Sequence, residues 1–275
     1  MVSTEPIIII RPSHRLALPN LHEIWDYREL LLTFVTRDLK VRYRQTLIGG
    51  LWAVFQPLTT MVIFSFFFGY LAKINSDGVP YPIFSYSGLI LWIYFANTLS
   101  ATSASILGSA GLFTKVYFPR IIAPLSAGIT GMVDYAISLF ILAGLMLYFH
   151  VAPSLYLLFL PLLVLLTWIL ATGIGLWVGS INVKYRDVGY IMPFFIQLFM
   201  YVTPVIYPVS IAPNFKDLLM LNPMTGIIEA HRSIILGTVQ PSFLSLTISI
   251  LMTLVIFISG TVFFRRVERH FADIV

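Results

Sequence analysis

The residue types that could carry out chemistry are few in this sequence and lie far apart. Its 275 residues include no cysteine, which excludes disulfides, thiolate nucleophiles, zinc–thiolate sites and iron–sulfur clusters. The sequence contains no G-x-x-x-x-G-K-[ST] phosphate loop, no H-E-x-x-H motif and no nucleophile elbow. We therefore expect no catalytic residue, no metal site, and no ATP or other cofactor bound by this chain itself.

One acidic residue, Asp134, interrupts the long apolar stretch 121–149, about a dozen residues from either end. An ionisable side chain at such depth in a membrane segment is a functional-site candidate by default. The alternative hypothesis is a protonated or hydrogen-bonded carboxyl group that clamps a neighbouring helix. No other long apolar stretch has a Lys, Arg, Glu or His at comparable depth. A proton-coupled pump, which needs a chain of titratable groups, is therefore disfavoured.

The composition predicts which elements must position these groups. The chain is 58% hydrophobic and only 11% charged, with a mean hydropathy of +0.89, whereas soluble domains are roughly 45–50% apolar and about 25% charged. This excess excludes a soluble enzyme and a disordered tail. A helix crosses a bilayer with about 20 apolar residues, and we expect an all-α membrane protein with six such helices. The predicted spans are 49–72, 84–107, 121–148, 155–181, 189–207 and 243–264.

The basic residues predict the orientation of these spans. Fourteen of the seventeen Lys and Arg residues fall on the side that carries both termini. These are Arg11, Arg15, Arg28, Arg37, Lys40, Arg42, Arg44, Lys115, Arg120, Lys184, Arg186, Arg265, Arg266 and Arg269. The other side has Lys73, Lys216 and Arg232. Since cytoplasmic loops are enriched in Lys and Arg, we expect both termini to be cytoplasmic.

The first twenty residues are predicted to be an extended cytoplasmic arm. The apolar run Ile7–Ile10 is too short for the core of a signal peptide, and no basic residue precedes it. The predicted organisation is this arm at 1–20, an amphipathic interface helix at 21–46, a membrane domain at 47–264 and a cytoplasmic tail at 265–275.

Residues 21–46 are too charged to cross a bilayer, but they have a helical pattern. One face is polar, and it consists of Asp26, Glu29, Thr33, Arg37, Lys40 and Arg44. The opposite face carries Ile24, Tyr27, Leu31, Phe34 and Val35. Such a helix lies in the membrane interface. Arg28, Asp38 and Arg42 break the pattern, and Asp38 and Arg42 have the i, i+4 spacing of an ion pair. This face either carries charges that reach water or contacts protein or an anionic headgroup.

The short segment 111–120 combines exposed apolar and basic residues on the predicted cytoplasmic side. Its candidate contact residues are Lys115, Val116, Tyr117, Phe118, Pro119 and Arg120. Apolar side chains on so small a loop indicate docking onto another protein. Insertion into the membrane interface is the alternative. On the opposite side, segment 211–241 has apolar pieces too short to span, interrupted by Pro223, Glu229 and Arg232, and it predicts a re-entrant or interfacial hairpin.

Two further patterns lie within the spans. Small residues recur every four positions in Ser100/Ala104/Gly108, Ala123/Ala127/Gly131 and Ala171/Gly175/Gly179, which indicates closely packed helices. Aromatic residues at depth or at ambiguous depth are Trp92, Tyr94, Trp168, Trp177 and Tyr201. These aromatic rings either contact lipid or line a channel in which sugars stack on them.

The order and spacing of several segments resemble the membrane subunit of type 2 ABC exporters, in the branch that exports polysaccharides such as O antigen, capsule and teichoic acid. The matching segments are Leu21–Leu31, Arg37–Thr46 followed by Gly49, Trp52 and Gln56-Pro57, then Lys115–Arg120, Tyr185-Arg186-Asp187, Asn222-Pro223 with Arg232, and Glu268–Asp273. The extended arm before the first segment is most similar to O-antigen permeases.

The resemblance implies a homodimer in the inner membrane with a pore at its two-fold axis. It implies two copies of a separate ATPase subunit, which holds ATP and Mg²⁺, and a cargo glycan carried on undecaprenyl diphosphate. Residues 115–120 would be the coupling helix, 24–46 the gate helix, 213–236 the periplasmic gate and 182–187 a minor ATPase contact. Basic residues at the entrance would attract the diphosphate, and the candidates are Arg42 and Arg44, with Arg37 and Lys40 behind them.

Three other hypotheses stay open. A type 2 ABC exporter of a drug, haem or another small hydrophobic cargo would share the fold. A secondary transporter is disfavoured because Asp134 has no charged partner at its depth within the other spans. A membrane scaffold without transport is the third. No nucleic-acid partner is expected.

Overall fold

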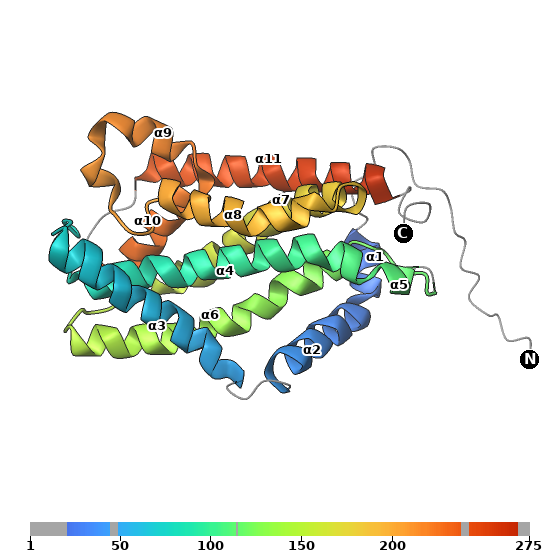
Figure 1. Cartoon of the computed structure of the whole chain (residues 1–275), viewed down its shortest axis with the longest axis horizontal. Helices are drawn as coiled ribbons and strands as arrows, with labels where there is room; N and C mark the ends of the chain where they lie inside the picture. Colours follow the sequence, from blue (N-terminus) through green and yellow to red (C-terminus); the bar gives the residue numbers. More distant parts are fainter. Residues whose placement is uncertain (1–20, 45–48, 114, 238–241, 269–275) are drawn as a thin grey trace, which may run out of the picture.

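The computed structural model describes residues 21–44, 49–113, 115–237 and 242–268, and every regular element in these ranges is helical. The α-helices are α1 (Leu21–Asp26), α2 (Arg28–Arg44), α3 (Trp52–Phe64), α4 (Tyr81–Gly108), α5 (Ala110–Phe113), α6 (Ile122–Tyr148), α7 (Leu160–Lys184), α8 (Asp187–Val202), α9 (Lys216–Met220), α10 (Pro223–Leu236) and α11 (Phe243–Glu268). The 3₁₀ and π elements are η1 (Gly49–Leu51), η2 (Ser65–Leu71), η3 (Leu155–Phe159), η4 (Val209–Ile211) and η5 (Pro213–Phe215). The long helices form one elongated bundle (Figure 1).

Five helical segments within the described residues are long and apolar enough to cross a membrane. They are Trp52–Leu71, Tyr81–Gly108, Ile122–Tyr148, Tyr156–Lys184 and Phe243–Glu268. These correspond to five of the six predicted spans and confirm an all-α, multi-pass membrane protein. The loop 115–120 and the last residue of α11 lie at one end of the bundle, whereas α9 and α10 lie at the other (Figure 1). Following the predicted orientation, we call these the inner and outer ends.

The predicted fifth span, 189–207, is only partly helical. Helix α8 has 16 residues, so it is about 24 Å long and shorter than the hydrocarbon core of about 30 Å. Its last residue is Val202, because the next residue, Thr203, precedes a proline, and helical backbone is disfavoured at that position. The segment still runs between the two ends of the bundle. The backbone N–H of Gly189 donates to Asn182 near the end of α7, and the carbonyl of Ile206 accepts from Tyr81 at the start of α4.

Helix α4 is the centre of the bundle and packs against α3, α6, α7, α8 and α10. Its close contact with α7 depends on two glycines. A Cβ atom at Gly175 would lie 2.6 Å from Thr102, and one at Gly179 would lie 2.7 Å from Ile106. These distances are too short for any side chain. The small-residue pattern of α7 therefore does bring two helices into backbone contact, as predicted.

The predicted interface helix is two helices, because the chain turns at Tyr27 between α1 and α2. Residues 45 and 46 lie outside the described residues. The two faces are confirmed: the residues of the polar stripe are exposed, and those of the apolar face are buried or half-buried. The predicted pair between Asp38 and Arg42 is wrong. Asp38 pairs with Arg37 at 2.8 Å, and Arg42 pairs with Asp134 of α6 at 2.7 Å.

The segment between α8 and α11 contains the predicted hairpin, with α9 and α10 as its two helices. Asn222 begins α10: its side chain accepts from the N–H of Met224 and donates to Thr203. Eleven of the 14 residues of α10 are buried, against α4, α7, α11 and η3. Helix α10 ends at Gly237, whose φ of +66° suits a glycine. Whether the hairpin enters the membrane stays a prediction.

Candidate functional site

Asp134 holds α2 against α6. Its carboxylate lies 2.7 Å from the guanidinium of Arg42 and also accepts a hydrogen bond from the hydroxyl of Tyr43. The side chain of Asp134 is 12% exposed, whereas that of Arg42 is 42% exposed. Burial, and then the adjacent carboxylate, raises the pKa of Tyr43, so this hydroxyl remains a neutral donor. The geometry is that of a clamp between two helices and favours that hypothesis for Asp134.

The partner of Asp134 could not be found by comparing the spans with one another. Arg42 lies on α2, outside every predicted span, and it reaches the carboxylate because α2 packs along α6. A carboxylate buried in an apolar environment is costly without a partner, and the Arg42 guanidinium supplies one. Arg42 pairs with Asp134 and not with Asp38, because an exposed i, i+4 ion pair would contribute only a few tenths of a kcal/mol to stability. Asp38 pairs with Arg37 instead.

A groove of about 480 Å³ lies beneath α2. From α2 it is lined by Arg37, Asp38, Val41 and Arg42, and from α4 and α6 by Ala101, Ala104, Ser105, Gly108, Ser109, Ala123, Ala127 and Thr130. Two of the predicted small-residue rows thus contribute to a cavity in addition to helix packing. The groove has two cations and one carboxylate on the α2 side and small side chains on the other.

The four predicted entrance residues do not act as one group. Arg37 and Arg42 line the groove, whereas Lys40 and Arg44 are exposed and outside its lining. Arg37 also lies over the ring of Phe34, with its guanidinium 4.8 Å from the ring centroid. A diphosphate in the groove would meet the first two cations directly, and the other two would act only through their long-range field. The headgroup role of all four stays a prediction.

The loop 115–120 has one exposed half and one anchored half. Lys115 is exposed, and Val116 and Tyr117 are 58% and 62% exposed. Phe118 is 6% exposed and packs edge-on against Phe34 of α2, with 5.6 Å between the ring centroids.

Two further residues complete the anchored half of this loop. Pro119 is buried, and Arg120 lies over the ring of Phe113 and donates to the backbone carbonyl of Glu268 in α11. The loop is therefore fixed to α2 and α11 while it presents two apolar side chains outward. A partner that displaced this loop would act directly on α2.

The predicted channel aromatics lie in different environments. Trp92 and Tyr94 are buried in the core, where their ring centroids lie 5.8 Å from Phe199 and 5.6 Å from Tyr135. Trp168 is half-buried, and its indole nitrogen is only 2.5 Å from where a Cβ atom of Gly128 would be. Trp177, also half-buried, stacks on Phe263 at 4.2 Å. Tyr201 is 50% exposed on α8. Their role in a channel stays a prediction.

Arg232 of α10 has a structural role that the sequence did not reveal. It is 7% exposed, and its guanidinium donates to the carbonyls of Pro204 and Val205 directly after α8. It also lies 3.8 Å from the ring centroid of Phe84. Burial lowers the pKa of Arg232 to about 9, so it remains charged at neutral pH. Gly88 makes room for it, since a Cβ atom there would lie 2.4 Å from the guanidinium. The sequence signal was a lone Arg among apolar residues.

Comparison with known proteins identifies the family of this fold. The family model described as "ABC-2 type transporter" matches residues 29–236. The chain belongs to the ABC-2 type transporter family. The match extends from the first turn of α2 to the end of α10, so it includes the clamp at Asp134, the loop 115–120 and the hairpin. The resemblance seen in the sequence is confirmed.

Several curated relatives match most of this chain. "O-antigen export system permease protein RfbA" of Myxococcus xanthus is 26% identical over 77% of this chain and 82% of its own length. A protein of the same name from Klebsiella pneumoniae is 26% identical over 90% of this chain and 95% of its length. "Polysialic acid transport protein KpsM" of Escherichia coli is 24% identical over 84% and 91%. These relatives place the chain in the polysaccharide-exporting branch of the ABC-2 permeases.

Proposed function

We propose that this chain is the permease subunit of an ATP-driven exporter that moves a lipid-linked polysaccharide, O antigen in the first place, across the cytoplasmic membrane. The observation that carries the proposal is its similarity, over 77% and 90% of the chain, to two permeases named for O-antigen export. Both termini are cytoplasmic in this proposal, because most of the Lys and Arg residues lie on their side.

The energy for transport comes from a separate subunit in this proposal. The chain has no phosphate loop, so ATP and Mg²⁺ belong to an ATPase partner and no cofactor is bound here. Val116 and Tyr117 form the contact for that partner, because they are exposed and apolar on a loop whose second half is anchored to α2 and α11. Two permease chains and two ATPase chains complete the exporter, with the pore between the permeases.

The groove beneath α2 is the proposed binding site for the undecaprenyl diphosphate headgroup. Arg37 and Arg42 supply charge-assisted hydrogen bonds to phosphate oxygens. Because the same Arg42 also binds Asp134, arrival of the headgroup would compete with the clamp that holds α2 to α6. Capture of the lipid would thereby loosen the gate helix. The glycan then slides through the pore on weak, repeated contacts with aromatic rings.

A second candidate cargo is capsular polysaccharide. The relatives named polysialic acid transport protein favour it, with coverage close to that of the O-antigen permeases. Both cargoes are long, hydrophilic chains. Teichoic acid or a small hydrophobic cargo would use the same fold.

The test is deletion of the gene in the native strain, followed by complementation. We expect surface O antigen to disappear from lipopolysaccharide gels and lipid-linked glycan to accumulate on the cytoplasmic side. The wild-type gene should restore export only while the partner ATPase can hydrolyse ATP. Normal surface O antigen in the deletion strain would overturn the proposed cargo. Loss of capsule alone would move the assignment to the second candidate.

A further inference from the structure

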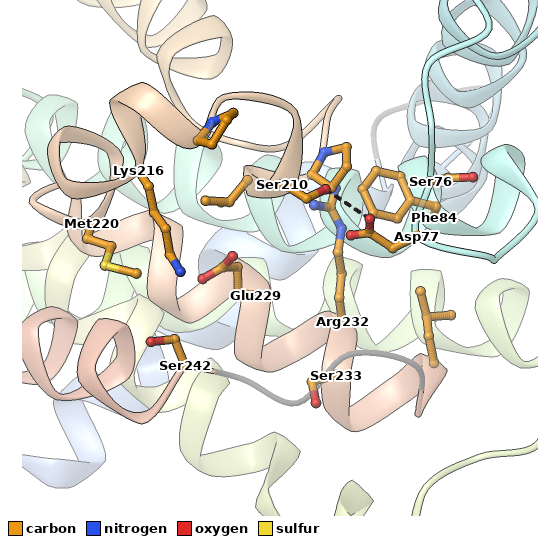
Figure 2. Close-up of a pocket in the computed structure, with 14 residues that line it drawn as sticks. Ser76, Asp77, Phe84, Ser210, Lys216, Met220, Glu229, Arg232, Ser233 and Ser242 are labelled. Atoms are coloured by element: carbon orange, nitrogen blue, oxygen red, sulfur yellow. Dashed lines mark hydrogen bonds between the residues drawn. The ribbon is translucent and has the colours of Figure 1, made fainter.

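A cavity of about 350 Å³ opens at the outer end of the bundle. It lies between the loop before α4, the helices α9 and α10, and the start of α11 (Figure 2). Its volume falls within the range of about 300–1,000 Å³ that is typical of small-molecule sites. Figure 2 shows Lys216 and Glu229 close together on one side of the cavity, and Arg232 extending toward Asp77 and Phe84 on the other side. The groove beneath α2 shares none of these residues.

Arg232 and Asp77 have hydrogen-bond partners in the chain, but the charged groups of this cavity form no ion pairs within the described residues. These groups are Asp77, Lys216, Glu229 and Arg232. One carboxylate oxygen of Glu229 and the Nε of Arg232 are buried without a hydrogen-bond partner in the described part of the chain. Buried polar groups are normally hydrogen-bonded, so unpaired groups beside a cavity mark positions for a ligand.

The balance of charge identifies the ligand class. Two cations and two anions line the cavity, so an anionic ligand would meet two carboxylates and a cationic ligand two basic groups. A hydroxyl group suits this mixture, because it donates to a carboxylate and accepts from an ammonium or guanidinium group. Ser210, Ser233 and Ser242 add hydroxyls of their own, and Ser210 already donates to Asp77 at 2.9 Å. Burial raises the pKa of Glu229 by more than its contact with Ser245 and the nearby Arg232 and Lys216 lower it.

We propose that the cavity formed by Asp77, Lys216, Glu229 and Arg232 binds a neutral, polyhydroxylated sugar unit of the exported glycan as it leaves on the outer side. This inference rests on the proposed function. A sugar unit held at the outer end cannot slip back toward the inner end while the pore resets, so even weak binding there would favour outward movement.

The test uses the full permease with its ATPase in lipid nanodiscs. The probe is the soluble oligosaccharide released by mild acid from the O antigen of the native strain, and its binding is followed by saturation-transfer NMR and calorimetry. Lys216→Ala and Glu229→Gln should each weaken binding about tenfold or more, because each removes a charge-assisted hydrogen bond. The matched control is Asp217→Asn. Asp217 is an exposed acid on α9, next to Lys216, and it is outside the cavity lining.

The outcomes separate this inference from the proposed function. Unchanged binding in both variants would overturn the sugar site, while export that still required the permease would leave the proposed function standing. Surface O antigen in a strain without the permease would remove the proposed function itself. Co-purified phosphatidylethanolamine that is lost in Lys216→Ala, with probe binding intact, would assign the cavity to a lipid headgroup instead. Lys216 is an exposed side chain, so its removal leaves the fold in place.

Discussion

Where α2 meets α6, the carboxylate of Asp134 binds both Arg42 and Tyr43, whereas at the outer end one oxygen of Glu229 has no partner among the described residues. The charge of Asp134 is satisfied within the chain, and the nearby loop 115–120 exposes the apolar pair Val116 and Tyr117. The outer charges line an open cavity.

The difference indicates two kinds of contact. An apolar, anchored loop suits a protein partner, since association is driven by burial of apolar surface and weakened by unpaired charge. A cavity lined by hydroxyls and by charges that form no ion pairs within the described residues suits a small polar ligand. The inner end thus suits an ATPase partner, and the outer end suits a hydrophilic cargo.

The largest effect is expected from Tyr117→Asp. A charge in the centre of the docking surface would be desolvated on association, so the ATPase should no longer co-purify and surface glycan should fall to background. Tyr117→Phe keeps the apolar ring, so the ATPase should still co-purify and surface glycan should stay at its normal level. Export that survived Tyr117→Asp with a stable complex would remove the docking role of this loop.

Arg42→Ala should lower the free energy of unfolding by about 2–3 kcal/mol, because it leaves Asp134 buried with only the Tyr43 hydroxyl. This is less than the about 3–5 kcal/mol of a fully buried pair, since Arg42 is half-exposed. Adding Asp134→Asn removes the unpaired charge and should restore most of the loss. The measurement is thermal unfolding in detergent.

The same pair of variants separates the two roles of Arg42. Surface glycan is measured in the stable double variant, and Arg44→Ala serves as a control for an exposed cation outside the groove. A stable double variant that does not export assigns Arg42 to headgroup capture. A double variant that exports normally would show that Arg42 acts only in the clamp with Asp134.

At the outer end, Gly88→Ala should destabilise the fold by about 1–3 kcal/mol, because its Cβ atom would lie 2.4 Å from Arg232 and 3.0 Å from the carbonyl of Val205. Gly144→Ala is the matched control on α6, since a Cβ atom there meets nothing within 4 Å. It should be neutral or stabilising by up to about 1 kcal/mol. Equal unfolding temperatures for the two variants would contradict the tight placement of Arg232.

Periodic segments were predictable from the sequence, and irregular ones were not. The apolar face of α2 and five spans follow from a 3.6-residue period or from length, which local sequence determines. Helix α8 was predicted too long because its end depends on Pro204 and on carbonyls that bind Arg232 from a distant helix. Such partners cannot be read from periodicity.

The same limit applies to the candidate sites. The exposed half of the loop 115–120 could be predicted from residue type alone, since apolar side chains such as Val116 and Tyr117 are unusual on so short a predicted cytoplasmic loop. A clamp at Asp134 was one of two hypotheses, but its partner Arg42 was missed, because Arg42 and Asp134 are far apart in the sequence and the local i, i+4 spacing pointed to Asp38 instead. The outer cavity joins four separate segments of the chain, so no single stretch of sequence contains its pattern.

The smallest effect concerns His231, which connects the outer hairpin to α6. It is fully buried on α10, and its Nε2 lies 2.6 Å from the hydroxyl of Tyr135. Burial, and then the adjacent Arg232, lowers the pKa of His231 to about 3. The unfolded chain therefore takes up a proton below about pH 6.5 that the folded chain does not, and stability decreases as the pH falls from 6.5 toward 3.

Between pH 6.5 and 5.5 this one group should remove about 1 kcal/mol of stability, and above pH 6.5 its contribution should be complete. His231→Gln keeps a hydrogen-bonding side chain of similar length but does not titrate. Its thermal unfolding temperature should therefore change less between pH 7 and 5.5 than that of the wild type, even if it starts lower. Parallel pH profiles for the two proteins would show that His231 is not held neutral. The hairpin would then be open to water there, and the outer end would be less tightly packed against α6 than the buried contact with Tyr135 indicates.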